Sequence, residues 1–450
     1  MTRSTGLGGA SSPTGGRQLQ NGLLMEQTYR LSPGCEVLDL DTSLPTKPLL
    51  VILGNKHLQV SGVAKEVLVC LGKQRAKENH VATLLSLNAM APPPSEQLHM
   101  ALRALAEAGI VQTAPGTSSD ESDNGAKSSS ARGYFLFRIP LLSERMIRPI
   151  TSRLAPLFHD KYVAWLLPIL LLVHIILSCL FFGKFRGLLS SLQRSDYFLL
   201  LVGNYLALLL HEVGHASACV KGGVRHGPIG FGLYLVFPTF FADVTDAWRL
   251  PRRQRVVVDA GGIYMSLLAA TATAMLYLFT HQPVYAVLTA VYHTTVWVSL
   301  WPFIRMDGYW IISDALGVPN LMTANRQLTT WFLHRLRGRA RPRPHVLSIE
   351  PRRLRTLYLW YYLGSTISVF YVLFRLCRSY VPFVVRSVPF ILRDAILQIE
   401  VGGLCFHTLK SLIRVLVTVV PLVSISAYVV RWVSRLSKMA FVHTTQGQNE

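Results

Sequence analysis

Charged residues are scarce in this 450-residue sequence: Asp, Glu, Lys and Arg make up 15% of it, against roughly a quarter in soluble proteins. Closely spaced cysteines are also missing, because the six cysteines are scattered and none forms a Cys-x-x-Cys pair. The first 30 residues contain no continuous apolar stretch, so we expect no secretory signal and a cytoplasmic N-terminus. These absences exclude a disulfide-rich secreted domain. With half of the residues hydrophobic, they favour a membrane protein.

Acidic residues are few in the later part of the chain. Residues 1–130 carry 11 basic and 11 acidic side chains, whereas residues 131–450 carry 34 and 13. The densest basic run is Arg326–Arg355, with nine arginines and one acid. It lies between apolar segments and has few aromatic rings to stack on bases, so we expect no nucleic-acid partner. Basic loops on the cytoplasmic face of a membrane explain this charge better.

The N-terminal region is typical of a small α+β domain. Residues 1–30 are rich in Gly, Ser and Thr and are expected to be disordered. Within residues 31–115, two apolar runs around the Gly54-Asn55 turn signal predict a β-hairpin. Two amphipathic stretches then predict helices, the second ended by Gly109. The predicted hairpin and helices cover Leu49–Leu53, His57–Val60, Val63–Leu71 and Leu98–Ala108. A linker rich in Ser, Asp and Gly is expected over residues 116–135.

Apolar segments long enough to cross a membrane follow within residues 136–440. About 20 apolar residues span a hydrocarbon core of ~30 Å. The sequence therefore predicts an all-α polytopic membrane domain of about six transmembrane helices. The predicted spans are Val163–Phe182, Tyr197–Val220, Val256–Thr280, Val284–Ile304, Leu357–Cys377 and Leu412–Val430. The charged and apolar stretch Val381–Phe406 is interpreted as interfacial, re-entrant or an extra pair of short spans.

The basic residues predict the orientation of these spans. With both termini in the cytoplasm, the loops after spans two and four and the C-terminus are cytoplasmic, and these segments are basic. The exceptions are Lys184, Arg186 and Arg194 in the first outer loop.

The second predicted span contains the sequence His211-Glu212-Val213-Gly214-His215. On a helix, His211 and His215 project from one face about one turn apart, which suits two ligands of a zinc ion. Glu212 lies beside them, where it can take a proton from water at the metal. Three ionisable residues in an apolar helix are unfavourable in lipid unless they are paired, buried or metal-bound. The alternative interpretation is a polar contact between helices.

A third ligand is expected at the end of the fourth span. Asp307 is the only carboxylate between Asp259 and Asp314. It lies where Pro302 and Gly308 break the helix, which allows its side chain to turn inward. The alternative is a solvated loop aspartate.

These motifs resemble the site-2-protease-type intramembrane zinc metalloproteases. The resemblance is closer to bacterial peptide zinc metalloproteases associated with ribosomal-peptide biosynthesis. It covers roughly residues 135–325 and implies that His211, His215 and Asp307 bind Zn²⁺, with Glu212 as the catalytic acid and base. The matching segments are His211–Ala218, Phe237-Pro238, Asp243-Val244, Ala247–Arg249, Ala260–Gly262, Arg305–Trp310 and Pro319–Leu321.

The sequence departs from this family's pattern at two places. Trp301 stands where the family has an Asn that helps to hold the substrate backbone, which puts peptide positioning in doubt. Gly261-Gly262 stands where the family has Gly-Pro. Neither departure affects the ligands.

Residues 31–112 resemble the winged-helix peptide-binding domain of pyrroloquinoline-quinone biosynthesis. Such domains add the leader peptide of a precursor to the edge of a hairpin. The alternatives are a purely structural domain and DNA binding, which the zero net charge of residues 1–130 disfavours.

Two further histidines, His174 and His293, lie within predicted spans. His293 either faces the metal site or hydrogen-bonds to a neighbouring helix, and we favour the second. Two interpretations of the apolar stretch His226–Phe241 stay open. The resemblance implies a re-entrant element that presents substrate as a strand near the metal, and the alternative is a loop at the membrane surface.

Together these features predict a multi-pass protein of the bacterial cytoplasmic membrane that hydrolyses a peptide bond in a peptide or membrane-associated precursor. Its expected partners are that substrate and membrane lipid. One alternative is a non-proteolytic membrane protein for peptide export or immunity. Another is a membrane-tethered regulator that binds nucleic acid.

Overall fold

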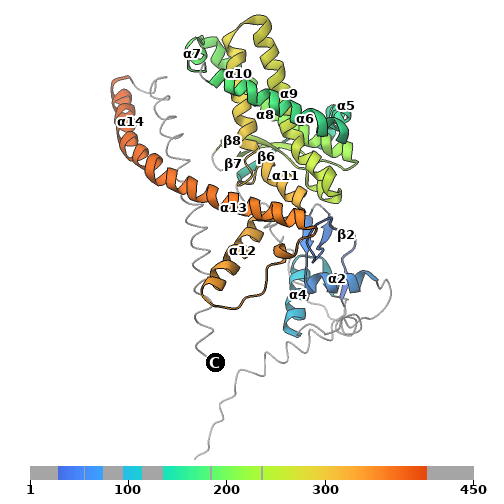
Figure 1. The fold of residues 1–450 in the computed structure, drawn as a ribbon. Helices are drawn as coiled ribbons and strands as arrows, with labels where there is room; N and C mark the ends of the chain where they lie inside the picture. Colours follow the sequence, from blue (N-terminus) through green and yellow to red (C-terminus); the bar gives the residue numbers. More distant parts are fainter. Residues whose placement is uncertain are drawn as a thin grey trace, which may run out of the picture. The chain divides into compact units, whose positions relative to one another are not determined.

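The structure is a computed structural model (Figure 1), and it describes residues 29–54, 56–73, 95–113, 135–182, 185–234 and 237–402. The predicted sixth span, Leu412–Val430, lies outside these residues, as do most of the predicted disordered N-terminus and linker. The chain divides into two compact units. The first comprises residues 1–129, 245–256 and 313–355, and the second comprises the rest.

The first unit contains the predicted β-hairpin. Strands β3 (Leu49–Leu53) and β4 (Lys56–Val60) pair antiparallel around the turn at Gly54, and β2 (Cys35–Asp39) adds to the other side of β3. A second small sheet joins β1 (Tyr29–Leu31) to β5 (Val111–Thr113). The predicted helices are α2 (Val63–Lys73) and α4 (Ser95–Glu107). Gly109 has a φ of 76°, as a helix C-terminal cap requires.

Both faces of strand β3 are buried. Leu49 and Val51 pack in the core formed with α2 and α4. Leu50 and Ile52 point to the opposite face, where Trp248 packs against them. Trp248 belongs to η2 (Thr245–Arg249), which is far from the strand in sequence. The apolar outer face of this sheet is therefore covered by a segment that lies, in the sequence, between the second and third predicted spans.

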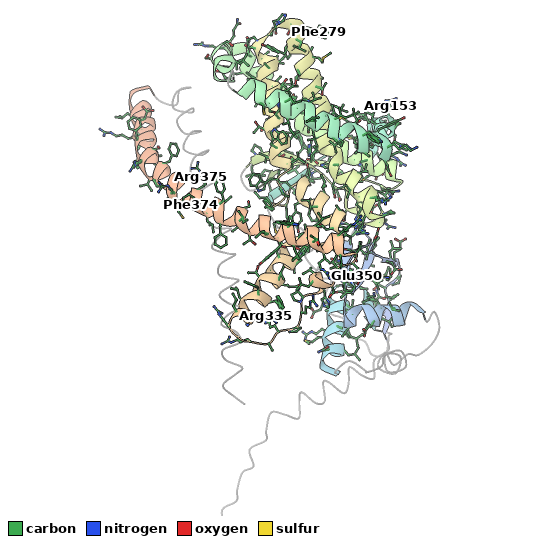
Figure 2. All side chains as sticks on the ribbon, in the orientation of Figure 1. Arg153, Phe279, Arg335, Glu350, Phe374 and Arg375 are labelled. Atoms are coloured by element: carbon green, nitrogen blue, oxygen red, sulfur yellow. The ribbon has the colours of Figure 1, made fainter. Side chains whose placement is uncertain are left out.

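The first unit also includes residues 313–355, which contain the basic run Arg326–Arg355. These residues contain α12 (Leu321–Leu336) and η3 (His345–Ser348). Their charged side chains, such as Arg335, extend away from the ribbon (Figure 2).

The second unit is mostly helical but not all-α. Strands β6 (Phe135–Leu142), β7 (Ile229–Tyr234) and β8 (Phe237–Ala242) form an antiparallel sheet in that order. The prediction of an all-α membrane part is wrong at this point. Strand β7 and all of β8 except its last residue, Ala242, lie in the stretch His226–Phe241, for which the sequence left a re-entrant element and a surface loop open. Two short helical segments follow β6: α5 (Glu144–Leu154) and η1 (Ala155–Phe158).

Long helices make up the remainder of the second unit. They are α6 (Asp160–Phe182), α8 (Arg194–Gly222), α9 (Arg252–Thr280), α10 (Pro283–Ser299) and α13 (Arg352–Arg375), with the short helices α7 (Phe185–Ser190) and α11 (Asp307–Leu316). Helices α9, α11 and α13 begin or end in the first unit. After α13, a π-helical turn (Leu376–Tyr380) leads into α14 (Val381–Gly402).

Four helical runs in the described residues are long and apolar enough to cross a membrane: Asp160–Cys179, Arg194–Gly222, Arg252–Thr280 and Arg352–Asp394. These runs indicate a membrane protein. Their large apolar side chains are widely exposed, among them Phe279 and Phe374 (Figure 2), as expected for surfaces that face lipid. The predicted fourth span corresponds to α10, whose 17 residues extend about 25 Å. The number of six membrane spans therefore remains a prediction from the sequence.

Candidate metal centre

Helix α8 places both histidines of the sequence motif on one buried face. It begins with a reciprocal capping box between Gln193 and Asp196 and ends at Gly223, whose φ is 82°. His211 and His215 lie one turn apart in its second half and are 7% and 8% exposed. Their Nε2 atoms are 3.2 Å apart. The helix thus delivers two imidazole nitrogens to one point inside the protein.

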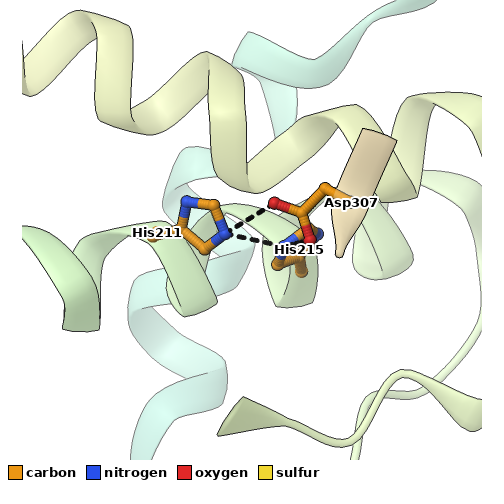
Figure 3. Close-up of side chains that lie close together, drawn as sticks. All are labelled: His211, His215 and Asp307. Atoms are coloured by element: carbon orange, nitrogen blue, oxygen red, sulfur yellow. Dashed lines mark hydrogen bonds and ion pairs between the residues drawn. The ribbon is translucent and has the colours of Figure 1, made fainter. Parts of the chain in front are cut away.

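Asp307 reaches the same point from another helix. It is the first residue of α11, and its Oδ2 lies 2.9 Å from His211 Nε2 and its Oδ1 3.5 Å from His215 Nε2 (Figure 3). The chain can return here because Gly308 packs directly on the backbone of Leu300. A Cβ on Gly308 would lie only 2.5 Å from the carbonyl carbon of Leu300.

Hydrogen bonds fix how the imidazole rings face. His215 Nδ1 donates to the carbonyl oxygen of Val258 at 2.8 Å. Because a carbonyl only accepts, the neutral ring must carry its proton on Nδ1, and Nε2 keeps a lone pair. His211 Nδ1 is hydrogen-bonded to Ser266 Oγ at 2.9 Å. Such outer partners orient histidine ligands in metal sites.

The three side chains fit a metal ion. Their possible ligand atoms lie within 4.8 Å of one another. Within the described residues, His211, His215 and Asp307 are the cluster of His, Cys, Asp or Glu side chains that could hold a metal ion. Zinc with nitrogen and oxygen ligands at about 2.0–2.1 Å in tetrahedral geometry separates those ligands by about 3.3 Å. Asp307 Oδ2 is buried and, within the residues that the structure describes, accepts no hydrogen bond of good geometry, although His211 Nε2 is close. A cation between these atoms would account for that arrangement.

Glycines let helix α9 lie against the two imidazoles. A Cβ on Gly262 would lie 2.5 Å from His211 Nε2. One residue earlier, a Cβ on Gly261 would lie 2.9 Å from the carbonyl oxygen of Gly214 on α8. The two helix backbones are therefore in direct contact at the site, which only glycine allows. Gly262 also leaves open the space in front of the histidines.

Glu212 is next to the ligands in sequence but is held by a different element. Its Oε2 accepts the backbone N–H of Ala242, the last residue of β8, at 2.7 Å. Glu212 is only partly buried. One carboxylate oxygen is therefore fixed by the sheet, while no hydrogen bond engages Oε1 within the described part of the chain.

Sequence reasoning did not find Ser266, Val258 or Ala242. Each acts on the site through a hydrogen bond to a ligand or to Glu212, across 30 to 55 residues of sequence. Two of these partners are backbone groups, which leave no signal in the residue type. Gly261-Gly262 was noticed as a motif, but its contact with the imidazoles was not.

Two other residues singled out in the sequence, His293 and Trp301, make contacts of their own. His293 is hydrogen-bonded to His174 at 2.6 Å and to Ser178 at 2.9 Å, so the favoured interpretation as a contact between helices is confirmed. Trp301 is 42% exposed and contacts the ring of Phe303 edge to face.

Comparisons with known proteins give one relative. The chain is 22% identical over 204 residues to a protein of Bacillus subtilis (strain 168) named "Putative peptide zinc metalloprotease protein YydH". The match covers 43% of this chain and 77% of the relative. No family model matches the sequence, and no solved structure matches it. The candidate metal centre therefore occurs in a chain that is similar, over less than half of its length, to a protein named as a peptide zinc metalloprotease.

Proposed function

We propose that this protein is a zinc metalloprotease of the bacterial cytoplasmic membrane that hydrolyses a peptide bond in a peptide or membrane-associated precursor. The observation that carries this proposal is the convergence of His211, His215 and Asp307 in a buried site on apolar helices. The similarity to a protein named as a peptide zinc metalloprotease supports it.

Zinc is the metal that this ligand set fits best. Two imidazoles and one carboxylate are typical of catalytic zinc sites, which keep a fourth position for water or substrate. When bound, zinc supplies Lewis-acid chemistry: it makes a water molecule more acidic and polarises the scissile carbonyl.

Glu212 is proposed as the general base and acid. It precedes Val213 in the same helical turn as the ligands, so its carboxylate can take a proton from water and pass it to the leaving amine. The hydrogen bond from Ala242 N fixes Oε2 and orients the group, which leaves Oε1 to handle the proton.

Strand β8 is proposed to bind the substrate. It is an edge strand, because within the described residues it pairs only with β7. An extended peptide can add to such an edge through main-chain hydrogen bonds. Ala242 ends this strand and contacts Glu212, so a peptide on the edge of β8 would run toward the catalytic carboxylate. Binding by backbone pairing also offers a way to hold a peptide without the amide that Trp301 replaces.

The topology proposed from the basic residues has support in the first unit. Residues 29–113 pack in one unit with residues 245–256 and 313–355, and these two segments come from the loops predicted to be cytoplasmic. All three segments must then lie on one side of the membrane. The chain leaves that side along α9 and must return before residue 313, so we propose α10 as a short crossing helix despite its length of 17 residues.

The N-terminal domain is proposed to bind the leader segment of the substrate. Its sheet has the order β2-β3-β4, with edges at β2 and β4 among the described residues, and either edge suits strand addition. Retention of DNA by the full-length protein at about 0.15 M salt would favour the regulator alternative instead.

The test is peptide cleavage by the purified protein with Glu212→Gln and Asp307→Asn variants. We expect both substitutions to abolish cleavage. Glu212→Gln should keep its metal, because Glu212 is not a ligand, whereas Asp307→Asn should bind it more weakly. If both variants process peptide as well as the wild type, the enzymatic proposal fails and the export or immunity alternative stands.

A further inference from the structure

The N-terminal domain contacts the rest of the first unit through its apolar sheet face and through a set of polar contacts. These contacts, made by Asp41, Ser43 and Arg255, are called the polar latch below. Asp41 Oδ2 accepts the backbone N–H of Arg252 at 3.0 Å, and Oδ1 accepts Arg252 Nε at 3.0 Å. Arg252 is the first residue of α9. Asp41 therefore caps the N-terminus of this helix from a distant part of the chain and places a negative charge where the helix dipole favours it.

A second contact of the latch is made at the end of α11. The backbone N–H of Ser43 donates to the carbonyl oxygen of Gly317 at 3.1 Å. The Ser43 hydroxyl donates to the carbonyl oxygen of Leu316, the last residue of α11. Gly317 has a φ of 65°, and a Cβ there would lie 2.6 Å from Ser43 N. The last carbonyl of α11 thus gains a partner from the N-terminal domain.

Arg255 ties these contacts together. Only 2% of its surface is exposed, and its Nε donates to Asp314 Oδ1 at 2.7 Å. Its Nη2 donates to the carbonyl oxygen of Asp41 at 3.0 Å and its Nη1 to that of Leu250 at 2.9 Å. A buried charge needs such complete pairing. One side chain therefore joins α9, α11 and the N-terminal domain.

Three segments of the chain run from this latch to the metal centre. Strand β8 ends at Ala242, which binds Glu212, three residues before η2 begins. On α9, Val258 follows Arg255 by three residues and accepts the hydrogen bond of His215. On α11, the ligand Asp307 precedes Asp314 by seven residues, which is two helical turns. Each segment that supports the metal site is thus anchored, a short distance along the chain, on the N-terminal domain.

We propose that residues 31–113 act in cis as a positioning domain for the metal centre. Docked through Asp41, Ser43 and the sheet face under Trp248, the domain fixes the ends of the three segments that carry Ala242, Val258 and Asp307. Asp41 and Arg255 are positioning residues, because they contact neither the ligands nor substrate. This inference rests on the proposed metalloprotease function.

The test uses full-length protein loaded with Co²⁺, whose visible absorption reports the geometry of its ligands. Asp41→Ala removes the cap and the ion pair. We expect it to weaken Co²⁺ binding about tenfold, as losses around ligand residues do, to change the absorption spectrum, and to lower kcat with little change in KM. Asp41→Asn keeps an acceptor for Arg252 N and should stay within about threefold of the wild type.

Arg103→Ala is the matched control. Arg103 lies on α4 of the same domain and makes an exposed pair with Glu107, so its loss should change none of these readouts. Arg255→Lys is a second test, which does not depend on correct folding of the Asp41→Ala variant. The lysine keeps the positive charge of Arg255 but cannot make all three of its contacts. It should move Co²⁺ affinity in the same direction.

The outcomes separate the two proposals. A wild-type protein that binds no Co²⁺ would overturn the metalloprotease proposal itself. A wild-type protein that binds Co²⁺, with Asp41→Ala and Arg255→Lys indistinguishable from it in spectrum and affinity, would overturn only the positioning role of the N-terminal domain.

Discussion

Two pairs of buried histidines lie in the second unit, and they differ in what their nitrogens face. In the first pair, the Nε2 atoms of His211 and His215 point at each other across 3.2 Å with the carboxylate of Asp307 beside them. In the second pair, His174 Nδ1 and His293 Nε2 are 2.6 Å apart with no carboxylate between them. The first arrangement brings two imidazole nitrogens and a carboxylate to one point, and the second joins a donor to an acceptor.

The second pair belongs to a closed hydrogen-bond chain. Thr271 Oγ1 donates to the carbonyl oxygen of Leu267 at 2.8 Å, so it accepts from His174 Nε2 at 3.0 Å. His174 Nδ1 then accepts from His293 Nε2, and His293 Nδ1 accepts from the Ser178 hydroxyl at 2.9 Å. Every ring nitrogen of the two neutral histidines has a partner.

The comparison indicates what separates a candidate ligand histidine from a structural one in this protein. Both pairs are nearly inaccessible, since His174 is 1% and His293 5% exposed, so burial does not distinguish them. The difference is whether the inner nitrogens form a donor–acceptor chain of neutral groups or meet at a carboxylate. In the second pair, the nitrogens of His174 and His293 belong to the hydrogen-bond chain, and these hydrogen bonds link α6, α9 and α10. At His211 and His215 the inner nitrogens instead converge with the carboxylate of Asp307, an arrangement that a cation would complete.

The largest effect that tests this comparison is expected from removing one histidine of each pair. His215→Ala should lower peptide cleavage by about 1000-fold or more, because a zinc site with two protein ligands loses both metal and geometry. His293→Leu should leave cleavage within about threefold and lower the free energy of unfolding by about 1–2 kcal/mol through lost hydrogen bonds. Cleavage assays and thermal unfolding measure the two. Equal losses of cleavage in both variants would contradict the distinction.

A smaller but still strong effect is expected at the glycine that faces the metal site. In Gly262→Ala, the new Cβ would meet His211 Nε2 at 2.5 Å, so an imidazole or helix α9 must move and metal affinity should fall about 100-fold. Gly187→Ala is the matched control, because a Cβ on this helical glycine meets nothing within 4 Å. Zinc titration of both variants checks the expectation, which fails if Gly262→Ala binds zinc like the control.

The smallest effect is expected at the outer partner of His211. Ser266→Ala removes the hydrogen bond to His211 Nδ1 and should weaken zinc binding about tenfold. Ser217→Ala is a matched buried control, because Ser217 Oγ donates only to the carbonyl oxygen of Val213 in its own helix. Competition with a zinc chelator gives both affinities. A Ser266→Ala variant as tight as Ser217→Ala would show that Ser266 does not orient the ligand.

The sequence predicted which three side chains would converge, because the chemistry of the candidate ligands shows in residue type and spacing. Two histidines four residues apart in an apolar helix share a face whatever the surrounding fold, and Asp307 was the one carboxylate near the end of a later segment. The structure brings all three together. Ser266 and the backbone groups of Val258 and Ala242 escaped notice, because tertiary packing alone decides which serine or peptide group meets a ligand.

The docked N-terminal domain was harder to predict, although one signal was present. The run Leu49–Leu53 is apolar at every position, whereas a strand with one solvent-exposed face alternates apolar and polar residues. A continuous run means that both faces are covered, here by the helices on one side and Trp248 on the other. Nothing in the sequence named Trp248 as the cover. The sheet of β6, β7 and β8 was missed for a related reason, because its first strand lies about 90 residues before the other two.

The zinc content of the purified full-length protein, measured beside that of the His211→Ala variant, tests the central claim most directly. The account predicts about one zinc per chain in the wild type and its loss in His211→Ala. A wild-type protein without zinc, or a His211→Ala variant that retains the wild-type zinc content, would contradict it.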